Sequence, residues 1–444
     1  MKVLLSHGYF LKEDKVEEVV MMPYPPQGLL HIATYLKTRN IDCEVFDSTF
    51  GSYDELCAFL LEYRPQYLGL YVNLMTRINI VKLLKFINDS QELNDTVVIL
   101  GGPDVSYHTG KYLDRGADYC ITGEGEHTFY RLIMHLEEDK KGPPGSIPGI
   151  SYRDENNETV YTGEPGLIKN IDELPFPDFG LIDIEPYFST WKENHGFTSM
   201  TISTMRGCPY SCRWCSKAVF GRTFRRRSPE MVAGELEKLQ KRYNPDRYWI
   251  VDDVFTISKE WLKGFTDEIK ARGLEISYEC VSRADRMDDE VIALLKESGC
   301  NTLWIGAESG SQKVLDLMDR RVEATRVRDM IKAAKRAGIE SGTFLMLGYP
   351  GETEKDIIET AKHLRDSLPD LLTITMAYPI PGTGLYEEAE KTGLKVPAEW
   401  GCYTDREINF KRTYRRTYYK HAIRYLHHSA EAGKALANRD MTGG

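Results

Sequence analysis

The residues RGCPYSCRWCSKAVFGR, at positions 206–222, decide the fold and the chemistry of this chain. Within them, Cys208, Cys212 and Cys215 are separated by three and then by two residues. They directly follow the stretch 198–204, which we predict to be a strand of a buried sheet. Because a loop at the end of a strand can fold three thiolates around one centre, the spacing predicts a metal site.

Three thiolates without a fourth partner favour an iron–sulfur cluster over zinc. Zinc sites usually take four ligands grouped in pairs, and neither a second cysteine pair nor a nearby histidine accompanies this triplet. A cubane of four irons and four sulfides can bind three thiolates and leave its fourth iron free to bind a substrate atom. The alternatives at this point are a structural zinc site and an accidental grouping of cysteines.

The sequence from the triplet onward predicts alternating parallel strands and helices. Ser228 before Pro229 places an N-cap ahead of a first-turn proline, and Gly273, Gly299 and Gly338 stand where helices end. Six such units predict a curled, partly closed barrel with its chemistry at the carboxyl ends of the strands. The candidate strands are Thr198–Thr204, Arg247–Asp252, Glu275–Val281, Thr302–Ala307, Gly342–Leu347 and Leu372–Tyr378.

The first 135 residues predict a second α/β unit, a doubly wound parallel sheet covered by helices. Neither G-x-G-x-x-G after the first strand nor G-x-x-x-x-G-K-[ST] occurs, which excludes the dinucleotide and P-loop interpretations. Ligands of such sheets bind beyond the carboxyl ends of the strands. The candidate strands are Lys2–Ser6, Ile41–Asp47, Tyr67–Val72, Thr96–Leu100 and Ala117–Thr122.

Length and composition support this division. A chain of 444 residues with 41% hydrophobic and 28% charged residues is globular and long enough for two or three cores. We expect domains at 1–139 and 197–386, an ordered linker at 140–196 and a helical extension at 387–444. A net charge of −10 disfavours a protein that coats nucleic acid, and no apolar run approaches the roughly 18 residues that span a bilayer. We therefore expect a cytoplasmic protein without a disulfide framework.

The Cys-x-x-x-Cys-x-x-Cys spacing, with Trp214 before the last cysteine, resembles the signature of the radical S-adenosylmethionine enzymes. The resemblance implies a 4Fe–4S cluster on the three cysteines, whose open iron chelates S-adenosylmethionine and whose electron cleaves it to a 5′-deoxyadenosyl radical. It also implies cofactor contacts from residues at the strand ends, although each could instead cap a helix or join an ion pair. These residues are Trp214, Asp252, Asp253, Arg283, Glu308, Ser309, Phe344 and Gly348.

Arg283 is expected to pair with the methionine carboxylate in a bidentate fork. Asp252 and Asp253 are expected to hold the ammonium or the ribose. The segment 206–227 carries seven Lys and Arg residues and no acid. Its arginines are either a solvated surface or a counter-charge to the thiolate-bound cluster.

The N-terminal unit resembles the cobalamin-binding domain that precedes many radical S-adenosylmethionine barrels. The matching stretches are PYPPQGLLHIATYL at 23–36, LGLYVNLMT at 68–76, VVILGGPDV at 97–105 and ITGEGEHTF at 121–129. The resemblance covers residues 1 to about 390 and implies cobalamin contacts from the loops. The residues are Gln27, Gly28, Asn73, Leu74, Met75, Gly101, Gly102, Pro103, Asp104, Gly123, Glu124, Gly125 and Glu126.

One departure concerns the lower face of cobalt. Cobalamin domains that place a histidine there carry Asp-x-His-x-x-Gly, which is absent here, as it commonly is in the radical subgroup. We therefore expect no cobalt ligand among His7, His31 and His108, and side chains at Asn73, Leu74 and Met75 nearest that face. A degenerate domain that no longer binds cobalamin is the alternative.

The best overall likeness is to the subgroup that contains the anaerobic magnesium-protoporphyrin ester cyclase and hopanoid-modifying enzymes. It implies methyl transfer from methylcobalamin to an unactivated carbon of a small molecule. Oxidation or ring formation on a similar substrate is the runner-up, and a cobalamin sensor without catalysis would have no use for the cysteines. The resemblance also implies an external electron donor such as flavodoxin or ferredoxin.

Basic and aromatic residues alternate in the segment 406–428. We favour an amphipathic helix whose aromatic side chains pack inward. The pattern also keeps open a transfer-RNA methylthiotransferase, although Cys43, Cys57 and Cys120 lie within a different predicted fold from that class and the tail has no strand pattern. We expect a small-molecule substrate and no nucleic acid.

Overall fold

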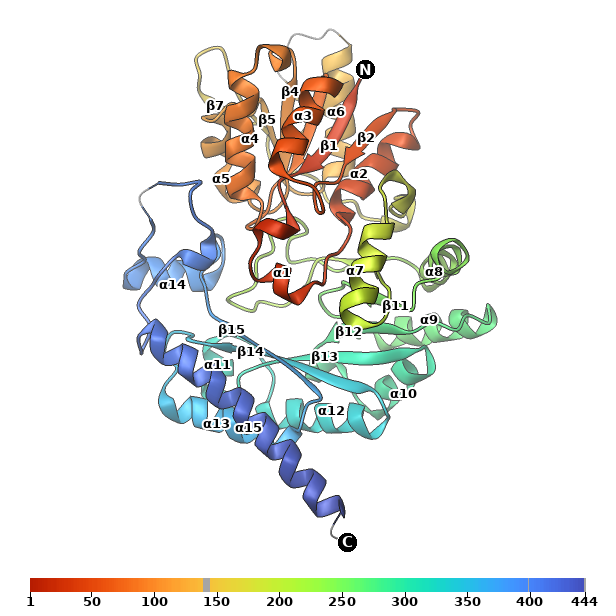
Figure 1. Ribbon diagram of the computed structural model, residues 1–444, viewed down its shortest axis with the longest axis vertical. Helices are drawn as coiled ribbons and strands as arrows, with labels where there is room; N and C mark the ends of the chain where they lie inside the picture. Colours follow the sequence, from red (N-terminus) through yellow and green to blue (C-terminus); the bar gives the residue numbers. More distant parts are fainter. Residues whose placement is uncertain (139–143, 398, 443–444) are drawn as a thin grey trace. The chain divides into compact units, whose positions relative to one another are not determined.

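The computed structural model describes residues 1–138, 144–397 and 399–442 and divides into two compact units (Figure 1). Unit 1 consists of Met1–Thr198, Lys217–Arg225 and Pro397–Glu407. Unit 2 consists of Ser199–Ser216, Arg226–Val396 and Ile408–Gly444. Over the described residues, no helix is long and apolar enough to cross a membrane.

Unit 1 is built on one sheet with the order β2-β1-β3-β4-β5-β6-β7 over its described residues. The first five strands are parallel, whereas β6 and β7 are antiparallel additions at one edge. The order reverses between β1 and β3, and doubly wound sheets bind ligands at that switch point. The strands are β1 (Val3–His7), β2 (Cys43–Phe46), β3 (Tyr67–Tyr71), β4 (Val97–Gly101), β5 (Tyr119–Ile121), β6 (Ile150–Arg153) and β7 (Thr159–Tyr161).

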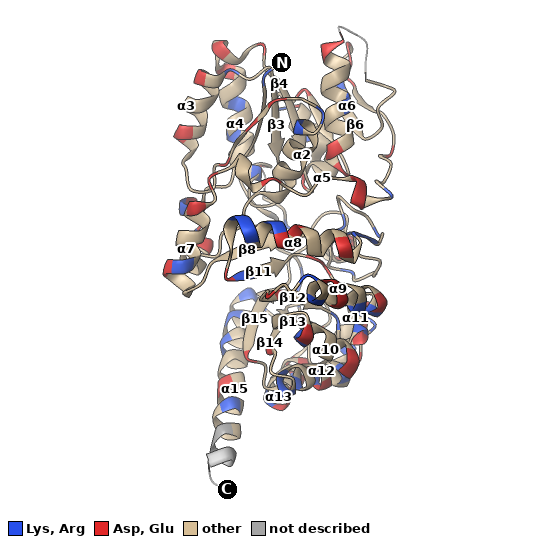
Figure 2. Cartoon of the chain, turned by 90° about the vertical axis from the view of Figure 1, so that its right-hand side faces the viewer, with Lys and Arg blue, Asp and Glu red and all other residues tan. Residues whose placement is uncertain are grey.

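Helices cover both faces of this sheet, with α3 and α4 on one side and α2 and α6 on the other (Figure 2). All five residues of β1 are buried, as expected of a strand covered on both faces. Ser52 and Glu55 form a capping box that begins α3. The helices are α1 (Glu17–Val20), α2 (Gln27–Lys37), α3 (Tyr53–Tyr63), α4 (Arg77–Asp89), α5 (Val105–Leu113), α6 (Gly125–Glu137) and α7 (Glu185–His195).

The stretch 140–196, expected to be a linker, is part of unit 1 in its described portion. It adds β6 and β7 to the sheet, and α7 follows them. The Tyr187 hydroxyl of α7 donates to Asp47 Oδ2 at 2.7 Å, and the Trp191 indole donates to the Pro23 carbonyl at 2.8 Å. The stretch therefore packs as part of the domain.

A second distant segment also packs on unit 1. The Trp400 ring lies 4.9 Å from the Tyr112 ring, and the guanidinium of Arg115 lies 4.9 Å from its centroid. Arg115 and Arg77 donate to the carbonyls of Trp400 and Tyr403 at 3.4 and 3.5 Å. The segment 397–407 thus returns from the barrel sequence to the helices α4 and α5.

Unit 2 is the predicted partial barrel, a six-stranded parallel sheet with the order β15-β14-β13-β12-β11-β8 among its described residues. A strand is present at each of the six predicted places, and Ser228 accepts from the Met231 amide at the start of α8 as an N-cap. The strands are β8 (Ser199–Ile202), β11 (Arg247–Ile250), β12 (Tyr278–Ser282), β13 (Cys300–Glu308), β14 (Glu340–Leu347) and β15 (Leu371–Met376), with the short β9 (Met205–Arg206) and β10 (Arg225–Arg226) flanking the cysteine loop in sequence.

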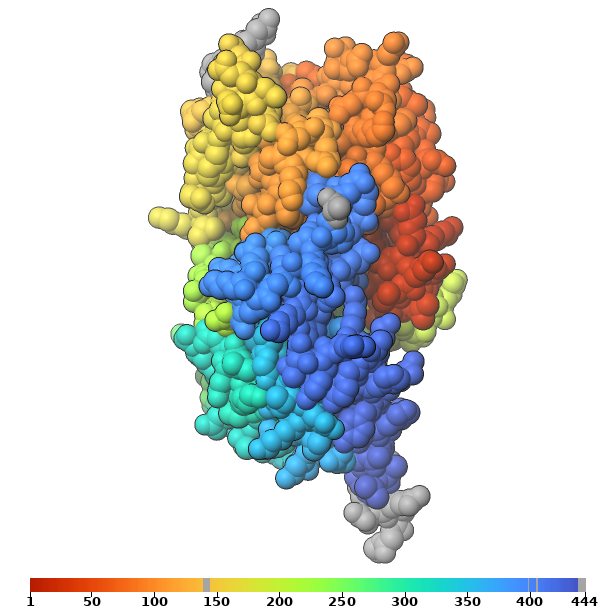
Figure 3. Space-filling view, turned by 90° about the vertical axis from the view of Figure 1, so that its left-hand side faces the viewer, coloured from red at the N-terminus to blue at the C-terminus, as the bar shows by residue number. Residues whose placement is uncertain are grey.

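The helices of unit 2 line the outer face of the curled sheet, as α9, α10 and α12 show in Figure 1. The C-terminal helix α15 packs on α13, where Gly433 approaches Arg365 and Leu368, and its other side is exposed (Figure 3). The helices are α8 (Pro229–Tyr243), α9 (Lys259–Ala271), α10 (Asp289–Glu297), α11 (Gln312–Leu317), α12 (Ala324–Arg336), α13 (Glu354–Ser367), α14 (Gly384–Thr392) and α15 (Arg416–Thr442).

The amphipathic interpretation of the tail holds for two of its five aromatic side chains, whereas Tyr414 and Tyr418 are partly buried. Phe410 and Tyr419 are buried, whereas Lys420, Arg424 and Tyr425 are exposed on α15.

Candidate active site

The cysteine loop begins at a buried carboxylate. Asp252, which follows β11, is 2% exposed and accepts hydrogen bonds from the backbone amides of Thr204 and Met205 at 2.7 and 3.1 Å. Arg226 Nη2 lies 3.2 Å from the same carboxylate. Burial raises the pKa of Asp252, although Arg226 and the hydrogen bonds act in the opposite direction. Asp252 therefore fixes the chain just ahead of Cys208.

Arg226 holds the other end of the loop. Its guanidinium lies 3.4 Å from the Trp261 ring centroid and donates to the Phe255 carbonyl at 2.7 Å. Burial lowers the pKa of Arg226 to about 10, with Asp252 opposing that effect. The amide of Arg227 donates to the Thr204 carbonyl at 2.9 Å, which brings the two ends of the loop together.

Two guanidinium groups approach one of the three cysteines. Arg283 Nη1 lies 3.5 Å and Arg320 Nη1 lies 3.7 Å from the sulfur of Cys212. Cys208 and Cys212 are buried, whereas Cys215 is exposed. The cations at this sulfur thus come from the ends of β12 and α11, outside the arginine-rich loop.

Several arginines of that loop instead pair with other groups. Arg213 lies 3.2 Å from Glu388, and Arg225 lies 2.5 Å from Glu124 within unit 1. Arg213 and Arg225 of the loop thus form structural ion pairs. The arginines at the Cys212 sulfur, Arg283 and Arg320, come from outside the loop.

Arg283 is 2% exposed and its donors are already engaged. Nε and Nη2 lie 2.9 and 3.3 Å from the two carboxylate oxygens of Asp285, and Nη2 donates to the Arg320 carbonyl at 2.7 Å. The guanidinium also stacks 3.8 Å from the centroid of Tyr210. Asp285 therefore occupies the bidentate position of Arg283. The bidentate contact of Arg283 with a methionine carboxylate stays a prediction.

The turn Met318–Arg321 is a part of the site that the sequence analysis missed. Asp319 and Arg321 adopt left-handed backbone conformations, with φ of 49° and 54°. The Ser211 hydroxyl donates to Asp319 Oδ2 at 2.5 Å, and the Arg213 amide donates to the Met318 carbonyl at 3.1 Å. This turn therefore contacts the cysteine loop on both sides of Cys212.

Glu308 ends β13 at an irregularity in its pairing with β14 and has a φ of 62°. Its carboxylate lies 3.7 Å from Arg320 Nη2. Burial raises the pKa of Glu308, and Arg320 and Arg283 pull it down. A left-handed backbone at a glutamate is uncommon and marks strain of the kind that gathers at functional sites. Glu308 therefore contacts Arg320, one of the two arginines at the Cys212 sulfur.

The other predicted contacts lie near this group with local roles of their own. Ser309 accepts from the Ser311 amide at 3.1 Å, and Phe344 stacks on Trp304 with centroids 4.7 Å apart. Gly348 has a φ of 81° and donates its amide to Glu352 Oε2 at 2.6 Å. Trp214 packs against a buried apolar cluster, and Asp253 is exposed. Their contacts with a cofactor stay predictions.

The chemistry of the donor set fits an iron–sulfur cluster. All nine cysteines are free thiols. Among the described residues, no three His, Cys, Asp or Glu side chains stand close enough to hold a single metal ion, as a zinc site would need. Three cysteines within one short loop supply the thiolates that iron–sulfur clusters take as ligands.

The sheet edge of unit 1 combines tight turns with open space. A Cβ at Gly102, whose φ is 114°, would lie 2.4 Å from the Val72 carbonyl oxygen, whereas a Cβ at Gly101 would meet nothing within 4 Å. Gln27 Nε2, at the start of α2, is buried without a hydrogen-bond partner among the described residues. Open backbone and an orphaned amide suit a bulky polar ligand, as predicted for cobalamin at Gln27, Gly28, Gly101 and Gly102.

Other predicted cobalamin residues hold the loops of this edge. Asp104 pairs with the buried Arg77 and accepts from Tyr112 at 2.5 Å. Asn73 Oδ1 accepts from the amides of Met75 and Thr76 at 2.9 and 3.0 Å. Glu124 accepts from the Ile168 amide at 2.9 Å. A Cβ at Gly125 would lie 2.9 Å from Ile32, so this glycine allows α6 to pack on α2, and a Cβ at Gly123 would meet Pro165.

The remaining predicted contacts of the edge are placed on its loops. Leu74 and Met75 are partly buried, Pro103 follows Gly102, and Glu126 is buried in the first turn of α6.

The expectation that no histidine binds cobalt stays a prediction, and the structure supports it for His7. His7 Nε2 lies 3.0 Å from Asp47, and its Nδ1 lies 3.1 Å from the Ser48 hydroxyl, so both ring nitrogens are engaged. His108 lies at a kink in α5, 5.2 Å from the Trp400 ring, and burial lowers its pKa to about 4.

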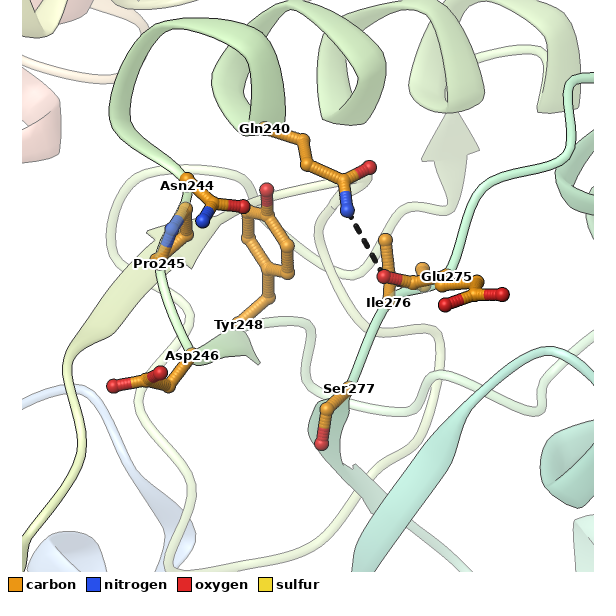
Figure 4. Close-up of a pocket in the computed structure, with 8 residues that line it drawn as sticks. All are labelled: Gln240, Asn244, Pro245, Asp246, Tyr248, Glu275, Ile276 and Ser277. Carbon is orange, nitrogen blue, oxygen red and sulfur yellow. Dashed lines mark hydrogen bonds between the residues drawn. The ribbon is translucent and has the colours of Figure 1, made fainter.

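A polar cavity of about 380 Å³ lies elsewhere in unit 2 (Figure 4). It is lined by the end of α8 and the residues just ahead of β11 and β12, including Asn244, Tyr248 and Glu275. The amino-terminal rim of a barrel is where stability is built, so this cavity is separate from the site at the carboxyl ends.

Comparisons with known proteins agree with the two sites. Residues 16–133 match the B12 binding domain and residues 202–364 match the radical SAM superfamily. The chain is 29% identical over 403 residues to an uncharacterized methyltransferase of Pyrococcus horikoshii, covering 88% of this chain and 84% of the relative. It is 25% identical over 377 residues to the anaerobic magnesium-protoporphyrin IX monomethyl ester cyclase of Rubrivivax gelatinosus, covering 82% of this chain and 66% of that enzyme.

The fold is also that of a solved enzyme. The radical S-adenosylmethionine methyltransferase TsrM from Kitasatospora setae, with cobalamin and a 4Fe–4S cluster bound, superposes with a TM-score of 0.72 at 19% identity. The match covers 89% of this chain and 76% of TsrM. The two domains imply a 4Fe–4S cluster, S-adenosylmethionine and cobalamin as cofactors. The chain therefore carries a B12-binding domain at residues 16–133, followed by a radical S-adenosylmethionine domain at residues 202–364.

Proposed function

We propose that this enzyme transfers a methyl group from cobalamin to an unactivated carbon of a small molecule. The observation that supports this most is that one chain combines a cysteine loop flanked by buried arginines with a sheet edge that leaves Gly101 open. When bound, cobalamin supplies the methyl group, and the cluster with S-adenosylmethionine supplies a 5′-deoxyadenosyl radical. An external one-electron donor such as flavodoxin or ferredoxin would reduce the cluster.

The residues of the barrel mouth divide into two roles under this proposal. Asp252 and Arg226 hold the loop that carries the cysteines. Glu308, Asp253, Phe344 and Gly348 are the proposed contacts of S-adenosylmethionine: Asp253 follows β11, Glu308 ends β13, Gly348 directly follows β14, and Phe344 lies within β14. In unit 1, Gln27 and the open backbone of Gly101 are the proposed contacts of cobalamin.

The methyltransferase proposal is favoured over the cyclase alternative by the extent of the likeness. The aligned region spans 84% of the uncharacterized methyltransferase of Pyrococcus horikoshii at 29% identity, against 66% of the Rubrivivax cyclase at 25% identity and 72% of a second cyclase at 24% identity. Oxidation or ring formation is the second candidate.

The methylthiotransferase alternative is disfavoured by the structure. Cys43, Cys57 and Cys120 lie on three separate elements, β2, α3 and β5, rather than in one loop.

The test uses S-adenosylmethionine with a labelled methyl group and the anaerobically reconstituted full chain. We expect S-adenosylhomocysteine to form only when cobalamin is present, with the label recovered in the extracted cobalamin even without substrate. With substrate, one S-adenosylhomocysteine and one 5′-deoxyadenosine should form for each methylated product. Formation of 5′-deoxyadenosine with no cobalamin-dependent S-adenosylhomocysteine would overturn the proposal in favour of the cyclase-like reaction.

A further inference from the structure

Cys212 differs from an ordinary ligand cysteine in having two buried cations at its sulfur. Arg283 Nη1 and Arg320 Nη1 lie 3.5 and 3.7 Å from it, and the two residues are 2% and 7% exposed. An arginine side chain stays charged in proteins, and N–H groups that point at a thiolate stabilise its negative charge. The sulfur of Cys212 is therefore held in a strongly positive environment.

Contacts of both Nη atoms and of the backbone carbonyl hold Arg320 in this position. Its Nη2 donates to the Gly306 carbonyl at 2.9 Å and lies 3.7 Å from Glu308, while its own carbonyl accepts from Arg283 at 2.7 Å. The guanidinium carbon lies 5.8 Å from the Trp214 ring centroid. The side chain therefore cannot turn away from Cys212 without breaking several of these contacts.

The backbone on either side of Arg320 supports the same conclusion. Asp319 and Arg321 both have left-handed φ angles, which are unfavourable for residues with a side chain and persist only where the surroundings enforce them. Asp319 is held by the Ser211 hydroxyl of the cysteine loop. Strain on both sides of one arginine indicates that its placement matters to the site.

A buried cation at a cluster ligand changes the energy of reduction. Uptake of one electron adds one negative charge to the cluster, and nearby positive charge and N–H groups on the sulfurs favour that reduced state. Glu308 offsets part of the charge of Arg320, but it lies on Nη2 rather than on the Nη1 that faces the sulfur.

We propose that Arg320 is a positioning residue that holds Cys212 and raises the reduction potential of the cluster, so that a one-electron donor can reduce it. The inference rests on the cluster that the radical domain implies and not on methyl transfer. A failed methyltransferase test would leave it standing, and its own failure would leave the methyltransferase proposal standing.

The experiment compares Arg320→Gln, Arg320→Lys and Arg321→Gln in the full chain, reconstituted anaerobically without S-adenosylmethionine. Redox titration is followed by electron paramagnetic resonance of the reduced cluster. For Arg320→Gln we expect the ratio of reduced to oxidised cluster at a fixed potential to fall at least tenfold, which corresponds to 59 mV. In Arg320→Lys this ratio should fall less, because an ammonium group keeps the positive charge but cannot reach both Cys212 and Gly306.

Arg321→Gln is the matched control. Its side chain is 73% exposed and pairs with Asp319, so the potential should stay at the wild-type value. Iron content, measured for each variant, should remain at about four per chain.

An unchanged potential in iron-loaded Arg320→Gln would overturn the proposal, even if the affinity for S-adenosylmethionine fell. If Arg320→Gln does not retain iron, Arg320→Met, which also removes the charge, decides, and a wild-type potential in an iron-loaded form of that variant would equally overturn it. An equal shift in Arg321→Gln would also overturn it, because the effect would then come from general surface charge.

Discussion

In unit 2 the loop after β8 is held by a buried carboxylate, whereas in unit 1 the loop after β4 turns at a glycine. Asp252 accepts two backbone amides and an arginine, and two further arginines stand at Cys212. Gly102 instead packs its bare Cα against the Val72 backbone, and Gly101 faces open space. Charged side chains thus hold the loop in unit 2, whereas glycines without side chains shape the loop in unit 1.

The difference follows from what each edge must bind. A cluster on thiolates carries negative charge, so buried cations stabilise it. A large corrin ring needs room and backbone contacts, which glycines leave. Unit 1 also has a buried ion pair between Arg77 and Asp104, and the Tyr112 hydroxyl donates to the same carboxylate. The predictions below test whether the two edges depend on charge and on space as this comparison requires.

The largest effect is expected from the cysteines. Replacing Cys208, Cys212 or Cys215 with alanine should abolish the cluster, measured as loss of iron and of the broad absorbance near 400 nm. Cys402→Ala is the control, because Cys402 is exposed and lies outside the loop. Full iron in the triple variant would contradict the assignment of the ligands.

The next effect concerns Asp252. Asp252→Asn leaves Arg226 buried without its carboxylate, and breaking a buried ion pair costs about 3–5 kcal/mol of the free energy of unfolding. Chemical denaturation of the full chain should show this loss of unfolding free energy. The exposed neighbour Asp253→Asn should leave stability within about 0.5 kcal/mol of the wild type. Equal stability of the two variants would show that Asp252 does not hold the loop.

A pH-dependent effect is expected at Glu352, which accepts the Gly348 amide at the barrel mouth. Burial raises the pKa of Glu352 to about 7 from 4.5. Between those values the folded state keeps a proton that the unfolded state has lost, so this group makes stability fall as pH rises. Between pH 4 and pH 8, the free energy of unfolding of Glu352→Gln should therefore rise by about 3 kcal/mol relative to that of the wild type.

Denaturation curves across that pH range check the gain. Glu354→Gln, two residues on and exposed, is the control and should show no such gap. A constant difference between Glu352→Gln and the wild type at all pH values would contradict the protonated state of Glu352.

The smallest effects separate the two glycines of unit 1. Gly102→Ala should cost about 1–3 kcal/mol of stability, because its φ of 114° and the Val72 carbonyl leave no place for a Cβ. Gly101→Leu should fold with nearly wild-type stability, since nothing lies within 4 Å, but should weaken cobalamin binding at least tenfold, or about 1.4 kcal/mol. Thermal unfolding and absorbance titration with cobalamin measure the two effects. Unweakened binding in Gly101→Leu would remove Gly101 from the cobalamin site.

The strands and the ligand cysteines could be predicted because their signals are local. Each strand of the barrel is a short apolar run that ends in a polar or glycine-rich loop, and the cysteine spacing lies within eight residues. Arg283 could be found for the same reason, since it directly follows the predicted third strand of the barrel.

Arg320 could not be predicted in this way. In the sequence MDRR it resembles the charged end of a surface helix, and only the left-handed turn at Asp319 and Arg321 directs it to Cys212. Asp252 was found by its position but not by its contacts, which depend on the distant Thr204 and Arg226. The strands β6 and β7 were missed because they are short, and β7 has no buried residue to mark it.

The segment 397–407, which packs Trp400 on α5, has a consequence for how the protein can be dissected. A fragment that ends at Thr198 would contain the whole seven-stranded sheet yet lack Trp400, the carbonyls that receive Arg77 and Arg115, and the Arg225 partner of Glu124. Its exposed apolar and charged surfaces would favour aggregation of the excised piece. The B12-binding unit of this chain therefore depends on two short peptides from later in the sequence, Lys217–Arg225 and Pro397–Glu407. Recombination that moved this unit to another barrel would have to transfer both peptides with it.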